Sequence, residues 1–226
     1  LLYAHRGASG RLPENTLAAF RGAIDDGADG VELDLHASAD GVPVVLHDSD
    51  LARTTNGAGP VDALPLAALR RLDAGGGEPI PTFAETLDLL AGRLRLDIEI
   101  KQPGIERATL DVLAAYPAAE WAISSFDWDI LRAVRRLSPA AALWPLAEAV
   151  DDALLAIAAE LGAPAVSLHH AALTEATAAR LHAAGLAVVA WTVNDPVEAS
   201  RLRALGAAAL CTDHPAPIRG ALSDLA

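Results

Sequence analysis

The chain has 226 residues, a length within the ~200–250 residues that an α/β barrel uses as one domain. Hydrophobic residues make up 52% and charged residues 21%, so the composition predicts a folded chain with a large core and excludes a disordered one. Seventeen basic residues stand against 30 acidic ones, and the net charge of −13 repels nucleic-acid phosphates and anionic lipid headgroups. We therefore expect no nucleic-acid binding.

Two further features bear on the cellular setting. No apolar run reaches the ~18–20 residues that a membrane-spanning helix needs, so we expect no integral membrane association. The one cysteine, Cys211, has no second cysteine in the chain to pair with, which leaves the compartment open. A cytoplasmic location is favoured, and a secreted form stays open because the sequence begins at Leu1 without an initiator methionine.

Short apolar runs alternate along the chain with longer amphipathic stretches, a pattern typical of a repeated β/α unit with a parallel sheet. These runs predict eight strands, at 1–5, 30–36, 94–101, 121–125, 141–145, 165–168, 187–192 and 208–212. Helices are predicted near 15–26, 85–91, 105–115, 128–137, 152–161, 175–184, 196–205 and 216–222. Eight such units predict a (β/α)8 TIM barrel with its functional residues at the C-terminal ends of the strands.

An open doubly wound sheet is the alternative fold. It is disfavoured because the glycines of segment 5–10 have the wrong spacing for the phosphate-binding fingerprint of that fold. The one irregular region is 48–81, which is rich in Gly and Pro and contains a short apolar helix near 64–72. We interpret this region as an insertion on the catalytic face of a single domain that spans 1–226.

The second predicted strand carries polar side chains on one face. Because side chains alternate along a strand, Glu32, Asp34 and His36 share that face, whereas the leucines between them pack against helices. Two carboxylates in one barrel mouth repel each other unless a cation or a proton lies between them. The pattern therefore favours a metal site over a buried ion pair.

The third predicted strand repeats the pattern. Alternation places Asp97, Glu99 and Lys101 on one face, with Glu99 and Lys101 nearest the C-terminal end. Glu99 thus adds a third carboxylate to Glu32 and Asp34. Three carboxylates without a cysteine or a close histidine pair indicate a hard oxygen site for a divalent cation, Mg²⁺ or Ca²⁺ rather than Zn²⁺.

Basic and imidazole groups lie at neighbouring strand ends. Lys101 is the only lysine among the 17 basic residues, and we favour a contact with a phosphate oxygen or a leaving group over a plain neutralising pair with Glu99. His5 and Arg6 end the first strand, and His47 ends the apolar run 42–46. Two imidazoles and an arginine beside a dication are the groups that general acid–base attack on a phosphate ester requires.

At this point the sequence resembles the glycerophosphodiester phosphodiesterase family. The resemblance spans nearly the whole chain in order, and its first two segments are highly specific in combination. It rests on AHRGASGRLPENT (4–16), DGVELDLHASADGVPVVLHDSDLARTTNG (29–57), LRLDIEIK (94–101), AISSFD (122–127), AVVAWTVND (187–195) and CTDHP (211–215).

The resemblance implies a role for each matched position. The implied roles are catalysis for His5 and His47, metal binding for Glu32, Asp34 and Glu99, phosphate binding for Arg6 and Lys101, and packing on the glycerol side for Trp191. Glu14 matches a position that supports Arg6 or a histidine, although an acid in the first turn of a helix is also favoured by the helix dipole alone.

The implied function is metal-dependent hydrolysis of small-molecule glycerophosphodiesters to sn-glycerol 3-phosphate and an alcohol, a hydrolase activity in lipid and glycerol metabolism. One histidine would act as general base and the other as general acid. A lysophospholipase D-like or phospholipase-like phosphodiesterase is the first alternative. It needs an exposed apolar entry, for which the insertion offers only Leu64, Leu66 and Leu69 on one short helix. A catalytically inactive binding barrel is the second alternative, disfavoured because every matched position holds a competent residue.

Overall fold

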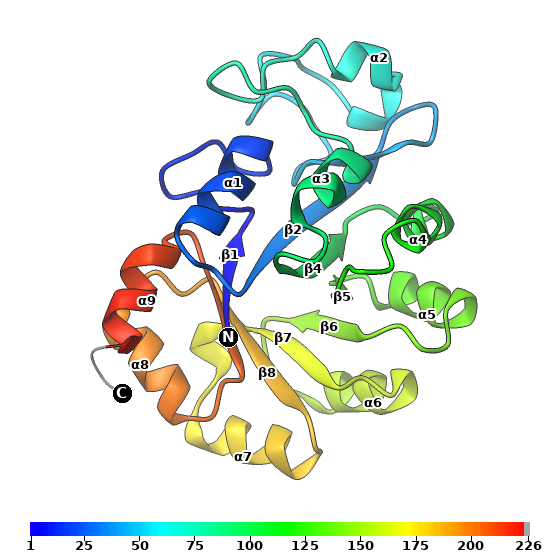
Figure 1. Cartoon of the computed structure of the whole chain (residues 1–226). Coiled ribbons are helices and arrows are strands. Elements are labelled where there is room, and N and C mark those ends of the chain that lie inside the picture. The colour runs from blue at the N-terminus through cyan, green and yellow to red at the C-terminus, as the bar shows by residue number, and fades with distance from the viewer. Residues whose placement is uncertain (224–226) are drawn as a thin grey trace.

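The structure is a computed structural model, and it describes residues 1–223. Eight parallel strands form a closed barrel in which β1 pairs with both β9 and β2 (Figure 1). The strands are β1 (Leu2–His5), β2 (Gly30–Ala37), β4 (Arg95–Ile100), β5 (Trp121–Ser125), β6 (Leu143–Ala147), β7 (Ala165–His169), β8 (Ala187–Trp191) and β9 (Ala209–Thr212). The predicted TIM barrel is confirmed.

Helices surround the barrel, as Figure 1 shows. They are α1 (Leu17–Asp25), α3 (Phe83–Leu90), α4 (Glu106–Ala114), α5 (Trp128–Leu137), α6 (Asp152–Leu161), α7 (Glu175–Ala183), α8 (Pro196–Ala204) and α9 (Pro215–Ser223). Several begin at a side-chain cap, because Thr16, Asp151 and Asp195 each accept a hydrogen bond from a first-turn backbone N–H. These caps fix where the loops at the C-terminal ends of the strands turn into helices.

One strand lies two residues beyond its predicted position. The prediction placed the fifth strand at 141–145. In the structure, β6 instead runs from Leu143 to Ala147. Its pairing with β5 covers Leu143–Pro145 and its pairing with β7 covers Leu146 and Ala147, so the proline lies where the pairing passes from one neighbour to the other.

An additional strand, β3 (Pro43–Val45), pairs antiparallel with β2 outside the barrel. The chain between β3 and α3 contains a 3₁₀ turn, η1 (Val61–Ala63), and α2 (Leu66–Leu69), which is shorter than the predicted helix. This segment has an apolar cluster of its own, separate from that of the barrel, which includes Leu46, Leu51, Leu69 and Ile80. In Figure 1 it projects at the top, beyond the ring of helices.

The alternation of β2 and β4 separates two environments. Leu33, Leu35 and Ile98 are fully buried in the main apolar cluster, whereas Asp34 and Glu99 belong to the opposite faces of these strands. The register places Asp34 opposite Glu99 in adjacent strands. The leucine and isoleucine side chains therefore hold the strands against the helices, and the carboxylates face the barrel interior.

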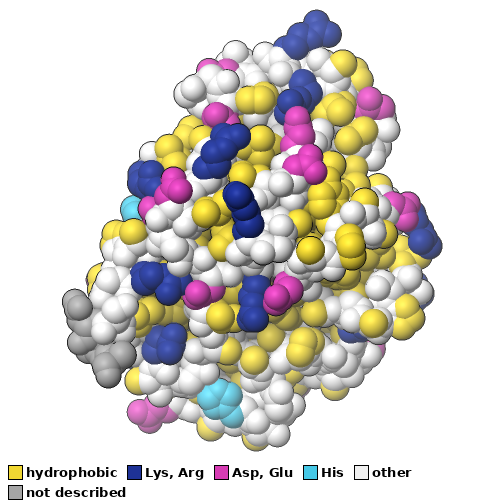
Figure 2. Space-filling view, viewed as in Figure 1, with side chains coloured by type: hydrophobic (Ala, Val, Ile, Leu, Met, Phe, Trp, Pro, Cys, Tyr) yellow, Lys and Arg dark blue, Asp and Glu magenta, His cyan; other side chains and the backbone are white. Residues whose placement is uncertain are grey.

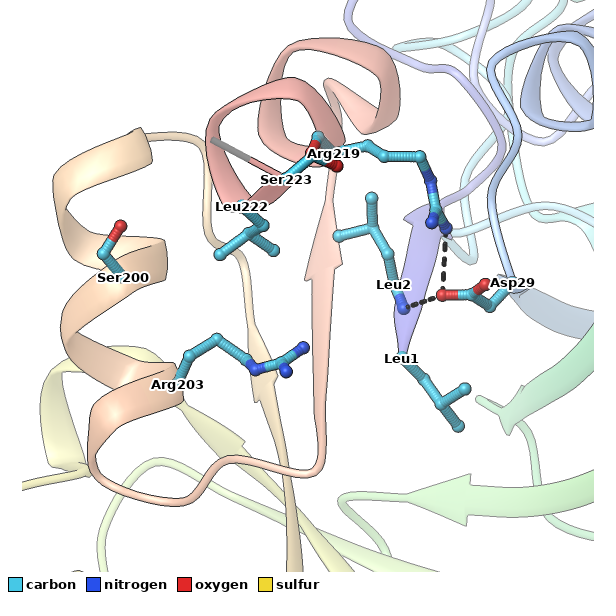
Figure 3. A pocket seen from close by; sticks show the side chains of 8 residues that line it. All are labelled: Leu1, Leu2, Asp29, Ser200, Arg203, Arg219, Leu222 and Ser223. Atoms are coloured by element: carbon cyan, nitrogen blue, oxygen red, sulfur yellow. Dashed lines mark hydrogen bonds and ion pairs between the residues drawn. The ribbon is translucent and has the colours of Figure 1, made fainter. Parts of the chain in front are cut away.

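A hollow of about 400 Å³ lies at the other end of the barrel, where the strands begin (Figure 3). There, Asp29 accepts a hydrogen bond from the backbone N–H of Leu2 (2.7 Å) and pairs with Arg219 of α9 (2.9 Å). This hollow thus belongs to the contact between the first strand and the last helix.

On the face in Figure 2, basic and acidic side chains are interspersed. Among residues 1–223, no helix combines the length and apolarity that crossing a bilayer requires.

Candidate active site

The predicted site residues meet in a pocket of about 130 Å³ at the C-terminal ends of the barrel strands. Its lining includes seven of them: His5, Arg6, Glu32, His47, Glu99, Lys101 and Trp191. Asp34 lies directly beneath, fully buried, and Glu14 contacts Arg6 from the side. The structure therefore brings together all nine residues, although they come from segments up to 186 positions apart in the sequence.

Three carboxylates form a compact cluster in this pocket. One carboxylate oxygen each from Glu32, Asp34 and Glu99 lies within 4.8 Å of the other two, and all three residues are buried. Burial, together with the neighbouring charge of Asp34, raises the pKa of Glu32 well above its ordinary value and raises the pKa of Glu99 to about 8. Burial acts on Asp34 in the same direction, but Arg6 and Lys101 hold its pKa below the usual range.

The cluster fits a hard divalent cation. Within the described part of the chain, Oδ1 of the buried Asp34 accepts no hydrogen bond, although Nζ of Lys101 lies 3.5 Å from it, whereas Oδ2 accepts one from Nδ2 of Asn15 at 2.8 Å. A buried carboxylate oxygen without a donor is costly unless a cation satisfies it. With oxygen donors from Glu32 and Glu99 beside it, the triad is a candidate site for Mg²⁺ or Ca²⁺.

Two cations flank the carboxylates. Nε of Arg6 lies 3.2 Å from Oδ2 of Asp34, and Nζ of Lys101 donates to Oε1 of Glu99 at 2.8 Å and lies 3.5 Å from Oδ1 of Asp34. Arg6 has a left-handed backbone, φ 55°, which is unusual for a residue with a side chain. Its backbone N–H donates to the carbonyl oxygen of Glu32 at 2.9 Å, which ties the loop after β1 to β2.

A carboxylate orients the His5 ring. Nδ1 of His5 lies 2.6 Å from Oδ1 of Asp213, which also accepts from the hydroxyl of Ser9. Asn194 donates to the other oxygen of Asp213 at 2.6 Å. Although burial opposes it, these hydrogen bonds hold the pKa of Asp213 well below its ordinary value. Because an ionised carboxylate only accepts, Nδ1 carries the proton and Nε2 is left for proton transfer.

His47 has the same arrangement on the other side of the pocket. Its Nδ1 lies 2.5 Å from Oδ1 of Asp48, and its backbone carbonyl oxygen contacts Nε2 of His36 at 3.1 Å. The N–H of Leu46 donates to the carbonyl oxygen of Asp34, which fastens the end of β3 to β2. Burial lowers the pKa of His47, which favours a neutral ring near neutral pH.

The remaining wall of the pocket is largely uncharged. Trp191 at the end of β8 meets Phe126 edge to face, with ring centroids 5.5 Å apart, and His169 contacts it in the same way at 5.2 Å. Phe126 is 46% exposed, so an aromatic surface reaches the pocket mouth. The charged groups come from the β1 to β4 part of the chain and the two aromatic side chains, Phe126 and Trp191, from the β5 to β8 part, so the site has an ionic half and an uncharged half.

Sequence reasoning missed the residues that hold the site in place. Asp48 follows His47 directly, so its position next to a histidine was an available signal. Asp213 is 208 positions from His5. Asn15, Arg53 and Asp213 lie within the segments that carry the family resemblance, and this was the only signal for them. The contacts of these residues form only when distant segments of the chain meet in the folded protein.

Fold and site together define a TIM-barrel enzyme with groups for anion binding and proton transfer beside a candidate metal site. A family model described as the glycerophosphoryl diester phosphodiesterase family matches residues 5–217. The chain therefore belongs to the glycerophosphoryl diester phosphodiesterase family, which confirms the resemblance found in the sequence. It is accordingly a phosphoric diester hydrolase.

Relatives and solved structures agree with this assignment. The chain is 33% identical to a glycerophosphodiester phosphodiesterase of Bacillus altitudinis, over 95% of this chain and 94% of that protein. It is 42% identical to one from Caldanaerobacter subterraneus subsp. tengcongensis, in an aligned region that covers 62% of this chain and 63% of that protein. A phosphodiesterase from Oleispira antarctica, solved with the product sn-glycerol-3-phosphate, superposes with a TM-score of 0.94 at 33% identity, over 98% and 96% of the two chains.

Proposed function

We propose that this chain hydrolyses glycerophosphodiesters to sn-glycerol 3-phosphate and an alcohol, with a divalent cation bound by Glu32, Asp34 and Glu99. The observation that carries the proposal is the meeting of two histidines, each hydrogen-bonded through Nδ1 to an aspartate, with a cluster of three carboxylates in one pocket. The family assignment and the product bound by the Oleispira antarctica enzyme support the choice of substrate.

In this proposal the charged half of the pocket holds the phosphate. The cation, when bound, neutralises phosphate charge and polarises the phosphorus–oxygen bonds. Arg6 and Lys101 supply the remaining positive charge, Arg6 beside Oδ2 of Asp34 and Lys101 beside Oδ1. Phosphoryl transfer depends chiefly on positioning and charge neutralisation, which these fixed groups provide.

The histidines move the protons. His47 has a lowered pKa, which fits a base that removes the proton of the attacking glycerol 2-hydroxyl. That attack gives a cyclic phosphate, and water then opens the ring to sn-glycerol 3-phosphate. Nδ1 of His5 is held by Asp213, which leaves Nε2, 3.9 Å from Glu32, facing the pocket as the atom that can pass a proton to the leaving group. His5 then protonates the oxygen of the departing alcohol as its bond to phosphorus breaks. Trp191 packs against the glycerol carbons.

The test combines chelation with histidine variants. We expect EDTA followed by dialysis to abolish the release of sn-glycerol 3-phosphate, and Mg²⁺ or Ca²⁺ to restore it. His5→Ala and His47→Ala each lower kcat by about 10²–10⁴-fold, the usual contribution of a positioned acid or base. His182→Ala, on the exposed surface of α7, is the matched control and keeps full activity. Full activity after chelation contradicts the metal assignment, and a loss below tenfold contradicts the role of that histidine.

One observation favours a second candidate, a lysophospholipase D-like activity. Phe126 offers an exposed aromatic surface at the pocket mouth that a longer apolar leaving group could contact. The leucines of the insertion do not provide the expected entry, because Leu69 is fully buried and Leu64 and Leu66 pack against the insertion's own apolar cluster. Adding a lysophospholipid to the substrate panel, with Phe126→Ala beside the wild type, distinguishes the two activities.

A further inference from the structure

Arg53 bridges two carboxylates at the edge of the active site. Its Nη1 and Nη2 donate to the two oxygens of Glu14, at 2.9 and 2.8 Å. Its Nε and Nη2 donate to the two oxygens of Asp48, at 2.6 and 2.9 Å. One guanidinium thus forms two forked pairs, the geometry for which arginine is suited and lysine is not.

Each of these carboxylates has a second partner that lines the pocket. Oε1 of Glu14 accepts from Nη1 of Arg6 at 2.9 Å, and Oδ1 of Asp48 lies 2.5 Å from Nδ1 of His47. The result is a continuous chain of contacts that runs through Arg6, Glu14, Arg53, Asp48 and His47. Its two ends are the group that we place on the phosphate and the group that we place on the attacking hydroxyl.

Arg53 itself lies next to the pocket and is not part of its wall. Its side chain is 47% exposed, and it is not among the residues of the described chain that line the pocket. Without it, Glu14 and Asp48 would face each other as like charges. Removing Arg53 also removes two hydrogen bonds from each carboxylate, so neither would stay fixed in its present orientation toward its partner in the pocket.

We propose that Arg53 is a positioning residue that sets the orientation of His47 relative to Arg6. Through Arg53, the segment 48–81 contributes to catalysis. The inference rests on the proposed function, since it requires that His47 and Arg6 act on the substrate. A displacement of about 1 Å in a reacting group can cost up to ~10²-fold in rate. We expect Arg53→Ala to lower kcat by about 10–10²-fold and to change KM by less than about threefold, because the other phosphate-binding groups stay in place.

The test compares Arg53→Ala and Arg53→Lys with Arg132→Ala. Arg132 is the matched control because it also bridges two carboxylates, Asp129 and Glu160, on the outer helices away from the pocket. Because Arg53 is half exposed, added methylguanidinium can reach the vacated position, and we expect it to restore part of the kcat of Arg53→Ala. Arg53→Lys keeps the charge but not the two forks, and we expect it to recover only part of the rate.

Double variants test whether the chain of contacts acts as one unit. If it does, Asp48→Asn in the Arg53→Ala background lowers kcat much less than Asp48→Asn alone. Additive losses overturn the inference, as does an Arg53→Ala enzyme with kcat within twofold of wild type. A loss that tracks a lowered Tm and that neither methylguanidinium nor lysine repairs assigns Arg53 a purely structural role and also overturns it. If Arg53→Ala does not fold, Arg53→Gln replaces it in every arm.

The outcomes for the inference and for the proposed function are separable. His47→Ala and Arg6→Ala are measured beside the Arg53 variants. If those two variants keep full activity, the proposed function fails. If they are inactive while Arg53→Ala is unimpaired, only the role of Arg53 is wrong.

Discussion

Lys101 touches two of the three carboxylates of the candidate metal site and is only 16% exposed. Replacing it with arginine keeps the charge but introduces a larger, planar and differently hydrated group. We expect Lys101→Arg to crowd Glu99 and Asp34 and to lower kcat by about 10²-fold, the cost of a misplaced catalytic geometry. Steady-state kinetics and a thermal melt check this. Wild-type kinetics in Lys101→Arg would reduce the residue to a neutralising charge.

The single residues of the site differ in how well the sequence predicts them. Glu32, Asp34 and Glu99 could be placed together because alternation and parallel pairing fix where strand-end side chains meet. The partner of His5 could not be predicted, because Asp213 reaches it only through the pairing of the first and last strands. Arg53 contacts Glu14, a residue 39 positions away that no local pattern connects to it, and Asp48 joins this network through Arg53.

At the scale of elements, the turn after β1 sets the position of Arg6. Gly7 has φ 82°, and a Cβ there would lie 2.6 Å from the carbonyl carbon of Ala19 in α1. Gly7→Ala must therefore move the loop away from the helix. Beyond the cost of a positive φ for alanine, at least about 1 kcal/mol, we expect a further loss of stability and a fall in kcat as Arg6 shifts.

Gly41, in the turn between β2 and β3, is the matched control for Gly7. It has a similar φ of 78°, but a Cβ there would contact no atom of the described residues within 4 Å. Gly41→Ala thus carries the backbone cost alone. Melting temperatures and kcat for the two variants separate the effects, and equal losses in both would show that the close approach of Gly7 to Ala19 is unimportant.

The elements themselves were largely predictable from hydrophobic periodicity and caps. α5 and α6 have their predicted bounds, because Asp127 and Asp151 cap them at the N-terminus and Gly162, in a left-handed conformation, ends α6. β3 was missed as a sheet strand, since a three-residue strand has too little alternation to be recognised. Its pairing with β2 depends on a contact that forms only in the folded chain.

At the scale of the whole molecule, buried acids give the metal-free protein an unusual pH dependence. Burial raises the pKa of Asp97 to about 7, and that of Glu99 to about 8. The folded state then holds protons that the unfolded chain has lost, so stability falls as pH rises from about 4 through 8. The acids with lowered pKa, such as Asp48 and Asp213, act oppositely, but only as pH falls below about 4.

We therefore expect the Tm of the EDTA-treated protein to be lower at pH 8 than at pH 5. Asp97→Asn should reduce this difference by at least about 2 °C, because it removes one buried ionisation while an asparagine oxygen can still accept from Ser124. Mg²⁺ or Ca²⁺ should raise Tm more at pH 8 than at pH 5. Scanning calorimetry at the two pH values checks these points, and a Tm that rises with pH would contradict them.

The segment 48–81 leaves and rejoins the barrel at one place. Val45 donates its N–H to the carbonyl oxygen of Pro81 at 2.9 Å, and Val44 forms a bridge with Thr82. Doubling the length of a closed loop costs only about 0.6 kcal/mol of free energy. We therefore expect this junction to tolerate inserted segments of very different length. A longer segment from another barrel could be grafted here without disturbing the barrel strands. The graft would have to begin after Arg53, so that the hydrogen bonds of Arg53 to Asp48 and Glu14 are kept.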